Sequence, residues 1–373
     1  MKKIELNSSE LSNKVQSVSK VQSNKNTLPI LDCVRFECKD GKLNIEAAEE
    51  GCYARSWMSV NSGENVVFGI NSKTLKDVLK TLPEQNITLS VDSASVIIKH
   101  AQGKVELPNE SMEEWPATPE AGEDNCLSVS ADALRSILAH CHPFIMPDEL
   151  RPVMNAICLR FGNEAGKLDA VASDGHSLIK QTHDCSFCCK GENTILIYNR
   201  FAKSIEQMLG KQTDTVDIFF NDRFAYVRLQ EFDCTIRLIE GKYPNYNSVI
   251  PTNYSSSVAV NKKEFTKCLE YVMPCSNASS MILSMTVKDG QISMRTADTD
   301  FGKSADANLP AEITGHDTVV GLKTTSLVEI MKHIPTDEVV MMYSDAGRAW
   351  MFLPKEQLSD MEQTIILMPM MLS

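Results

Sequence analysis

Apolar and polar residues alternate in a pattern that returns three times along the chain. The segments GKLNIEAAEEGCYA, GKLDAVASDGHSLI and GQISMRTADTDFGKS begin at Gly41, Gly166 and Gly290, at intervals of 125 and 124 residues. In each, a glycine turn precedes alternating apolar positions, the period of a half-buried strand. A second strand precedes each turn, as CVRFECKDG, CLRFGNEAG and LSMTVKDG. The pattern therefore predicts the same hairpin at the same point of three repeats.

Helical periodicity repeats on the same spacing. We predict six helices, over residues 9–25, 71–81, 130–142, 198–211, 261–274 and 323–334. The first helix of each repeat follows Ser9, Asp132 or Asn261, residue types that cap helix N-termini. Each repeat therefore contains a helix, a hairpin, a second helix and further strands, which is an α+β pattern.

Two polar, proline-bearing stretches at residues 109–124 and 242–257 have the composition of linkers. Together with the repeat length, they predict three domains, 1–122, 123–252 and 253–373. The chain has 373 residues, of which 43% are apolar and 23% charged. This is the ordinary mix of a protein that buries several cores.

The chain shows no membrane or secretion signal. Its longest strongly apolar run, Ile365 to Leu372, is far shorter than the eighteen or so residues that a spanning helix needs. The N-terminal MKKIELNSSE lacks the apolar segment of a secretory signal, so we expect a cytoplasmic protein. The 12 cysteines are scattered, which favours reduced thiols over a disulfide scaffold.

The net charge of −12 argues against nucleic-acid binding unless positive charge is concentrated somewhere. The six predicted helices together carry +8, so the rest of the chain carries −20. Lys73, Lys76 and Lys80 fall on one helix face. A basic helical lining within an acidic shell would attract a phosphate backbone. The alternative, that lysine is simply a good former of surface helices, stays open.

Two motifs could suggest an enzyme. Asp174 and His176 stand close together, yet no nucleophile motif accompanies them and an Asp-Gly turn explains the first part. The run HDCSFCC at 183–189 contains one C-x-x-C pair, without a second pair at a zinc-like distance. We therefore predict no catalytic residue, no metal and no cofactor.

Five motifs, in this order and spacing, resemble the bacterial DNA polymerase III beta subunit family, the sliding clamps. They are TLPIL at 27–31, RPVMN at 151–155, SDGHSL at 173–178, EGKYPNYNSVIP at 240–251 and a terminal MPMxL at 368–372. The resemblance extends over the whole chain and includes its length and its threefold repeat.

The resemblance implies three clamp-type domains, each with two helices packed on antiparallel sheets, and a head-to-tail homodimer that forms a closed ring around double-stranded DNA. Helices would line the hole and sheets would form the outside. Such a ring is not an enzyme. It would tether the replicative DNA polymerase for processive synthesis, and it would bind the polymerase III alpha subunit, the clamp loader and other proteins with clamp-binding linear motifs.

The resemblance also implies three sets of site residues. A peptide-binding pocket between the second and third domains would contain Met154, Ser173, Gly175, His176, Leu178, Pro244, Val249, Ile366, Met368, Pro369 and Met370. DNA-facing cations would be Lys25, Lys73, Lys76, Lys80, Arg151 and Arg200. The dimer interface would lie near Lys104, Val105 and Leu107 on one side and Met273, Pro274 and Cys275 on the other, with Asp298 and Asp300 as charge partners.

Two positions depart from the family pattern. Ser177 and Met371 stand where the pocket motifs commonly have arginine, so two cations are missing beside the expected pocket. A diverged clamp-like scaffold with altered partners is therefore one alternative function. A metal-dependent hydrolase that uses the region of Asp174 and His176 is the other.

Overall fold

The computed structural model describes residues 1–23, 26, 28–119, 122, 124–148, 150–164, 166–210 and 214–372. The chain folds into two compact units. The first unit contains residues 1–138, 185–190 and 197–240, and the second contains 139–184, 191–196 and 241–373. Each unit combines helices with antiparallel sheets, which confirms the predicted α+β class. The three domain boundaries stay a prediction.

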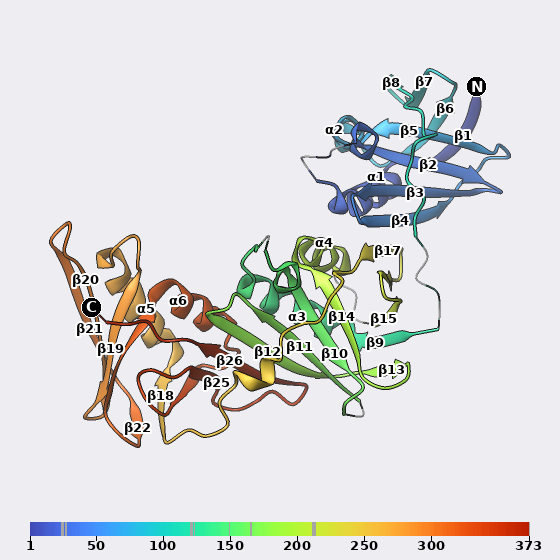
Figure 1. The fold of residues 1–373 in the computed structure, drawn as a ribbon. Coiled ribbons are helices and arrows are strands. Elements are labelled where there is room, and N and C mark those ends of the chain that lie inside the picture. Colours follow the sequence, from blue (N-terminus) through green and yellow to red (C-terminus); the bar gives the residue numbers. More distant parts are fainter. Residues whose placement is uncertain are drawn as a thin grey trace. The chain divides into compact units, whose positions relative to one another are not determined.

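All six predicted helices are present (Figure 1). They are α1 (Ser8–Val18), α2 (Ser72–Thr81), α3 (Ala131–Cys141), α4 (Asn199–Leu209), α5 (Lys262–Val272) and α6 (Thr324–His333). Short 3-10 turns extend three of them, η1 (Ser19–Val21), η3 (His142–Phe144) and η6 (Met273–Cys275). In the described part of the chain, no helix is long and apolar enough to cross a membrane.

Two of the three helix caps were predicted wrongly. Asn7, not Ser9, caps α1, because its side chain accepts hydrogen bonds from the amides of Ser9 and Glu10. The hydroxyl of Ser130, not the side chain of Asp132, accepts from the amide of Ala133 at the start of α3. In both cases the helix begins directly after a strand, so the last extended residue takes the capping position. Asn261 caps α5 as predicted.

The first unit contains two sheets. A four-stranded sheet has the order β1-β6-β7-β8, and a nine-stranded sheet has the order β13-β9-β15-β16-β17-β4-β3-β2-β5. Their strands are β1 (Lys2–Asn7), β2 (Cys33–Lys39), β3 (Lys42–Glu49), β4 (Cys52–Ser59), β5 (Val66–Asn71), β6 (Asn86–Val91), β7 (Ser95–His100), β8 (Gly103–Pro108), β9 (Cys126–Ser130), β13 (Ser186–Cys188), β15 (Thr215–Phe220), β16 (Phe224–Arg228) and β17 (Phe232–Arg237).

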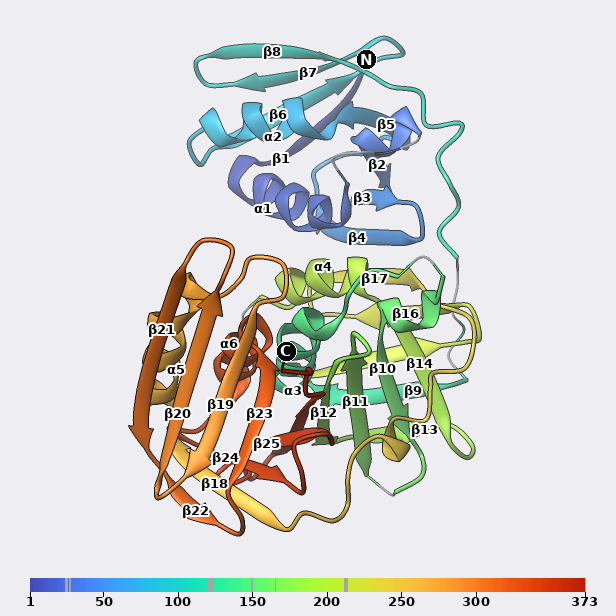
Figure 2. The ribbon, with the colours of Figure 1, turned by 60° about the vertical axis from the view of Figure 1, so that its left-hand side comes forward.

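The second unit repeats this arrangement, with sheet orders β21-β20-β19-β23 and β14-β10-β11-β12-β26-β25-β24-β18-β22. Figure 2 shows α5 lying along β20 and β21. The strands are β10 (Ala156–Phe161), β11 (Lys167–Ser173), β12 (Ser177–Asp184), β14 (Asn193–Tyr198), β18 (Ser256–Asn261), β19 (Ile282–Lys288), β20 (Gln291–Asp298), β21 (Lys303–Pro310), β22 (Glu312–Thr314), β23 (Thr318–Lys323), β24 (Glu338–Tyr343), β25 (Trp350–Pro354) and β26 (Met361–Leu367).

The repeated hairpins are confirmed as β2–β3, β10–β11 and β19–β20. In the first hairpin Asp40 and Gly41 have φ of 51° and 74°, and in the third Asp289 and Gly290 have φ of 51° and 75°. Two consecutive residues with positive φ form the turn whose twist matches a two-residue hairpin. The Asp-Gly pairs in the sequence therefore fix the register of these two hairpins.

Strands from different repeats pair within each nine-stranded sheet. In the first unit β17 pairs with β4, and in the second unit β12 pairs with β26.

The cores beneath are closely packed. Trp350 is fully buried and stacks on Tyr343, with ring centroids 4.4 Å apart. The sequence run that ends in Leu372 is therefore a core strand as far as Leu367, followed by a short tail.

We expect Asn261→Ala to lower the free energy of unfolding of the second unit by about 1 kcal/mol, because two amides at the start of α5 lose their acceptor. Urea unfolding followed by tryptophan fluorescence would measure it. Asn261→Asp keeps an acceptor oxygen and is the matched control. Equal losses in both variants would contradict the capping role.

Candidate functional site

A tight turn between β11 and β12 presents His176. The Asp174 carboxylate accepts hydrogen bonds from the amides of His176 and Ser177 at 2.8 and 2.6 Å, and the Ser173 hydroxyl donates to the carbonyl of Ser177 at 2.7 Å. Gly175 adopts φ of +87°, which favours glycine. The segment SDGHS is thus a self-stabilised turn, and the His176 side chain is exposed at its tip.

The C-terminal tail lies directly beside this turn. In the β12–β26 pair, Leu178 is opposite Ile366, and the Met368 amide then donates to the carbonyl of His176 at 2.8 Å. Further on, the Met370 amide donates to the carbonyl of Gly321 on β23 at 2.8 Å. Seven of the predicted pocket residues are therefore brought together, namely Ser173, Gly175, His176, Leu178, Ile366, Met368 and Met370.

Gly321 is a site residue that the sequence reasoning missed. A Cβ atom on it would lie 2.4 Å from the carbonyl oxygen of Met370 and 3.0 Å from a methyl group of Leu372. Only glycine therefore lets the tail run against β23. A glycine within the apolar strand TVVGLK was the available signal for a close backbone approach.

The predicted pocket residues include both buried and exposed apolar side chains. Leu178 and Ile366 are buried, with exposed fractions of 4% and 3%, so they support the surface from beneath and are scarcely accessible to a partner. Met368 is exposed to 42% and Val249 to 51%. Of the other predicted residues, Met154 is buried, Pro244 is exposed and Pro369 is half-buried. They belong to the same unit, and the contacts of Met154, Pro244 and Val249 with the turn stay a prediction.

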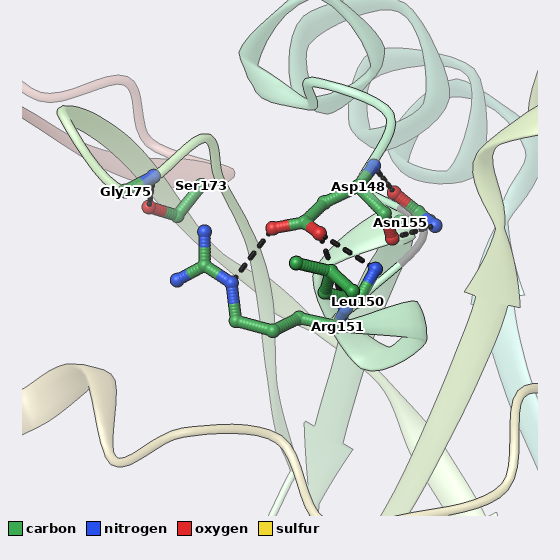
Figure 3. Close-up of polar contacts among 6 residues, drawn as sticks. All are labelled: Asp148, Leu150, Arg151, Asn155, Ser173 and Gly175. Atoms are coloured by element: carbon green, nitrogen blue, oxygen red, sulfur yellow. Dashed lines mark hydrogen bonds and ion pairs between the residues drawn. The ribbon is translucent and has the colours of Figure 1, made fainter.

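A network of hydrogen bonds holds the loop before Met154 (Figure 3). The Asp148 carboxylate accepts from the amides of Leu150 and Arg151, at 2.9 and 3.2 Å, and from Nε of Arg151 at 2.7 Å. The bond from the Arg151 side chain lowers the pKa of Asp148. Asn155 closes the loop by bonding both the amide and the carbonyl of Asp148. Arg151, a predicted DNA contact, is exposed but already ion-paired.

A cavity of about 400 Å³ with mixed polar and apolar lining, which includes Phe144, adjoins the turn. The hydroxyls of Ser177, Thr325 and Ser326 and the carboxylates of Asp174 and Glu329 are among its lining groups. Glu329 is paired with Lys332 and with His333, each at 2.9 Å. The side of the turn that contains Ser177 therefore adjoins two carboxylates, Asp174 and Glu329, together with the apolar side chain of Phe144.

The observed helices carry less positive charge than the predicted ones. Within their observed bounds the six α-helices carry +4 rather than +8. Lys20 and Lys323 lie outside the α-helices, in η1 and at the end of β23, while Lys25 and Lys211 lie outside the described residues. Helical periodicity overran the true helix ends by several residues. Half of the predicted concentration of charge on helices is therefore lost.

The lysines of α2 are accessible. Lys73 and Lys80 are exposed and Lys76 is half-buried, so the three form a basic stripe on one helix face. Partial burial lowers the pKa of Lys76, and the neighbouring Lys80 adds to this effect. The contact of these three lysines with DNA stays a prediction.

Arg200 has a structural partner. Its guanidinium lies 2.7 Å from the carboxylate of Glu49, whose side chain is only 4% exposed. Burial raises the pKa of Glu49, and the ion pair with Arg200 opposes that rise. A buried carboxylate without a partner is costly. Arg200 therefore stabilises the β3–α4 contact, a role independent of any contact with DNA.

Two residues of the motifs that could suggest an enzyme, His183 and Asp174, have structural hydrogen-bond partners. His183 is buried and lies 3.2 Å from the side-chain oxygen of Gln181, and burial lowers its pKa to about 4. One carboxylate oxygen of Asp174 is used by the turn. Within the described ranges, no three His, Cys, Asp or Glu side chains are grouped so that they could hold a metal ion.

Three models of one family match consecutive stretches of the chain. They are the N-terminal, central and C-terminal domains of the DNA polymerase III beta subunit, at residues 2–119, 128–245 and 247–371. Among curated relatives, a protein of Haemophilus influenzae named beta sliding clamp is 21% identical over 363 residues, 96% of each chain. A beta sliding clamp of Halalkalibacterium halodurans is 23% identical over 364 residues, 92% of this chain and 93% of the relative.

Solved structures agree with these matches. The DNA polymerase III subunit beta of Pseudomonas aeruginosa superimposes with a TM-score of 0.94 at 19% identity, over 99% of this chain and 100% of that one. The beta subunit of Thermotoga maritima gives 0.91 at 20% identity, over 100% of both chains. The three clamp domains predicted from the repeats are thereby confirmed. The hydrolase alternative receives no support from these relatives.

We expect Arg200→Ala to lower the free energy of unfolding of the first unit by about 2 kcal/mol at neutral pH, because Glu49 stays buried without its partner. A carboxyl whose pKa is raised by folding favours the folded state at low pH and disfavours it as the pH rises through that pKa. The deficit should therefore shrink as the pH falls and Glu49 takes up a proton.

Urea titrations at several pH values would measure this deficit. Lys203→Ala, an exposed lysine on the same helix, is the matched control and should have little effect. A deficit independent of pH would show that the Glu49 carboxyl does not carry the effect.

Proposed function

The chain belongs to the DNA polymerase III beta subunit family, and from this premise we propose that it is a DNA sliding clamp. Two copies would join head to tail into a ring that encircles double-stranded DNA without reading its sequence. The ring would tether the replicative polymerase by binding its alpha subunit. It would also bind the clamp loader and other proteins with clamp-binding motifs. It is not an enzyme, and it would act in the cytoplasm.

The sheet edges support this assembly. Four of the eight outer strands, β1, β5, β14 and β23, each make an isolated bridge to a further residue, and two more, β13 and β22, are only three residues long. The remaining two, β8 and β21, have six and eight residues and make no such bridge within the described part of the chain. Natural proteins rarely leave long edge strands uncovered. This observation carries the proposal.

The predicted interface residues lie at these two edges. Lys104, Val105 and Leu107 are on β8, while 273–275 form η6, which continues the helix packed on β21. Because one edge belongs to the first repeat and the other to the third, their pairing is heterologous. Such contacts close into a ring when the rotation between subunits permits. Asp298 is buried and Asp300 exposed, and the Asn277 amide contacts both at 3.4 Å.

Basic charge on helices supports sliding rather than tight binding. The chain is acidic overall, and each contact between a cation and a phosphate strengthens binding in a salt-dependent way. A weak lining such as Lys73, Lys76 and Lys80 would keep DNA centred, while topology rather than affinity prevents release. Lys25, Arg151 and Arg200 stay proposed members of this set.

The tail and the 173–178 turn would receive the partner's linear motif. The exposed side chains of Met368 and Val249 would offer apolar contacts, and His176 is joined to Met368 by a backbone hydrogen bond. Aliphatic and aromatic anchors of a peptide would bind there by excluding water. Ser177 and Met371 leave this surface without the two expected cations, so we propose that partner preference differs from that of clamps with arginine at these positions.

The ring is tested by retention on circular DNA. After loader-assisted assembly on nicked plasmid, we expect the protein to co-elute with DNA in high salt and to be released when the plasmid is linearised. Val105→Asp would place a carboxylate in the proposed interface and should abolish both dimerisation and retention. Sedimentation velocity would report the oligomeric state.

Val319→Asp alters an exposed valine on β23, away from the proposed interface, and is the control, so it should remain a retained dimer. A folded wild-type dimer that is never retained, yet still binds clamp-binding peptides, would overturn the clamp and favour the scaffold function.

The peptide site is tested by fluorescence anisotropy. We expect a labelled peptide with a glutamine and paired leucine and phenylalanine anchors to bind saturably. His176→Ala and Val249→Ser should each weaken it about tenfold, since each removes contact at the exposed surface. His100→Ala, on β7, is the matched control. Unchanged affinity in both site variants would overturn the assignment.

A further inference from the structure

One cysteine cluster has no part in the proposed function. β13 is flanked and ended by cysteines, with Cys185 before it, Cys188 as its last residue and Cys189 after it. β13 forms one edge of the nine-stranded sheet in the first unit and pairs with β9 (Figure 1). The register places Cys188 directly opposite Cys126.

This register brings two accessible sulfurs to one face. Leu127 and Val129 of β9 point into the core, so Cys126 and Ser128 occupy the solvent side of the strand. Cys126 is half-buried, its sulfur lying 3.7 Å from the Ser128 hydroxyl, and Cys188 is exposed. Directly opposed residues of antiparallel strands have Cβ atoms roughly 4.5–5.5 Å apart, and a disulfide spans up to about 4.5 Å, so a small closing movement joins the two sulfurs.

The C-x-x-C spacing itself cannot supply the pair. In extended chain, three residues separate Cα atoms by about 10 Å and place the two side chains on opposite faces. Cys185 and Cys188 are therefore farther apart than the roughly 7 Å that a disulfide tolerates. The adjacent Cys189 would require a strained ring with Cys188. The strand geometry thus selects Cys126, which is 62 residues away in the sequence.

We propose that Cys126 and Cys188 form a reversible thiol–disulfide pair, a site of oxidative modification on the solvent face of the β9–β13 edge. The Cys188 thiolate attacks a small-molecule disulfide and expels one thiolate, leaving a mixed disulfide on Cys188. The Cys126 thiolate then attacks the Cys188 sulfur and expels the second thiolate. Two protein thiols are oxidised and one small disulfide is reduced to two thiols.

The order of attack follows from access. Cys188 is exposed, whereas burial raises the pKa of the Cys126 thiol. Cys188 therefore meets the oxidant, and Cys126 resolves the mixed disulfide from its position across the strand. The resulting bridge would tie the three-residue strand β13 to the sheet.

A second pair provides an internal comparison. The sulfurs of Cys52 and Cys234 are only 3.8 Å apart, on β4 and β17, but both side chains are fully buried. Their mutual hydrogen bond and burial raise the pKa of Cys52 well above its ordinary value. If sulfur–sulfur distance alone decided which cysteines are oxidised, Cys52 and Cys234 would react. Because a dissolved oxidant reaches only exposed thiols, we expect Cys126 and Cys188 to react instead.

The full chain, reduced and freed of metal, would be treated in the folded state with oxidised glutathione, and remaining thiols would then be alkylated in denaturant before mass spectrometry. We expect a loss of two hydrogen masses, a peptide cross-link between Cys126 and Cys188 that dithiothreitol reverses, and complete alkylation of Cys52 and Cys234. The oxidised protein should also melt several degrees higher, because the bridge closes a long loop.

Two variants separate the steps. Cys126→Ser should retain one glutathione on Cys188, since nothing resolves the mixed disulfide, and Cys188→Ser should remain unmodified at Cys126. Circular dichroism would verify that both are folded. The proposal is overturned if wild-type protein stays unmodified, keeps glutathione on Cys188, or links Cys188 to Cys185 or Cys189. Preferential bridging of Cys52 to Cys234 in the folded protein would also overturn it.

Discussion

Backbone hydrogen bonding at sheet edges is the constraint on which this structure depends. A repeat of helix, hairpin, helix and further strands leaves strands with unpaired amides and carbonyls, which are costly to bury and liable to pair with other chains. The β4–β17 and β12–β26 pairings satisfy such strands by joining neighbouring repeats in one sheet. Local bridges and very short strands deal with most of the others. In the part of the chain that the structure describes, the edges that remain are β8 in the first repeat and β21 in the third.

The same pairing of backbone amides and carbonyls explains the proposed peptide site. The tail after β26 continues past the end of its strand by donating to the carbonyls of His176 and Gly321. These bonds fix the backbone positions of Met368 and Met370, so their side chains project from an ordered segment. The turn beneath is equally fixed, because Asp174 and Ser173 satisfy its amides and carbonyl internally. A partner peptide would therefore bind to a preorganised surface, and binding would lose little further conformational entropy of the clamp.

Sequence periodicity predicted the repeated architecture well, and for a physical reason. Asp-Gly pairs at 40–41 and 289–290 have few alternatives to a tight hairpin, and the helical periods reflect buried faces that the structure requires. Helix ends were predicted less well. Asn7 and Ser130 displaced Ser9 and Asp132 as caps, because the end of the preceding strand, a feature of tertiary structure, decides where a helix starts. The same overrun inflated the charge assigned to helices.

The site was harder to predict because its residues act through backbone contacts between distant segments. The need for Gly321 arises only once Met370 lies against it, and the ion pair of Arg200 appears only when β3 and α4 meet. The cysteines show the same limit. The sequence offered a C-x-x-C motif, whereas the strand register pairs Cys188 with a residue in another segment altogether. Local spacing describes chemistry only where the backbone conformation is known, because three residues of extended chain separate the side chains that a helical turn would bring together.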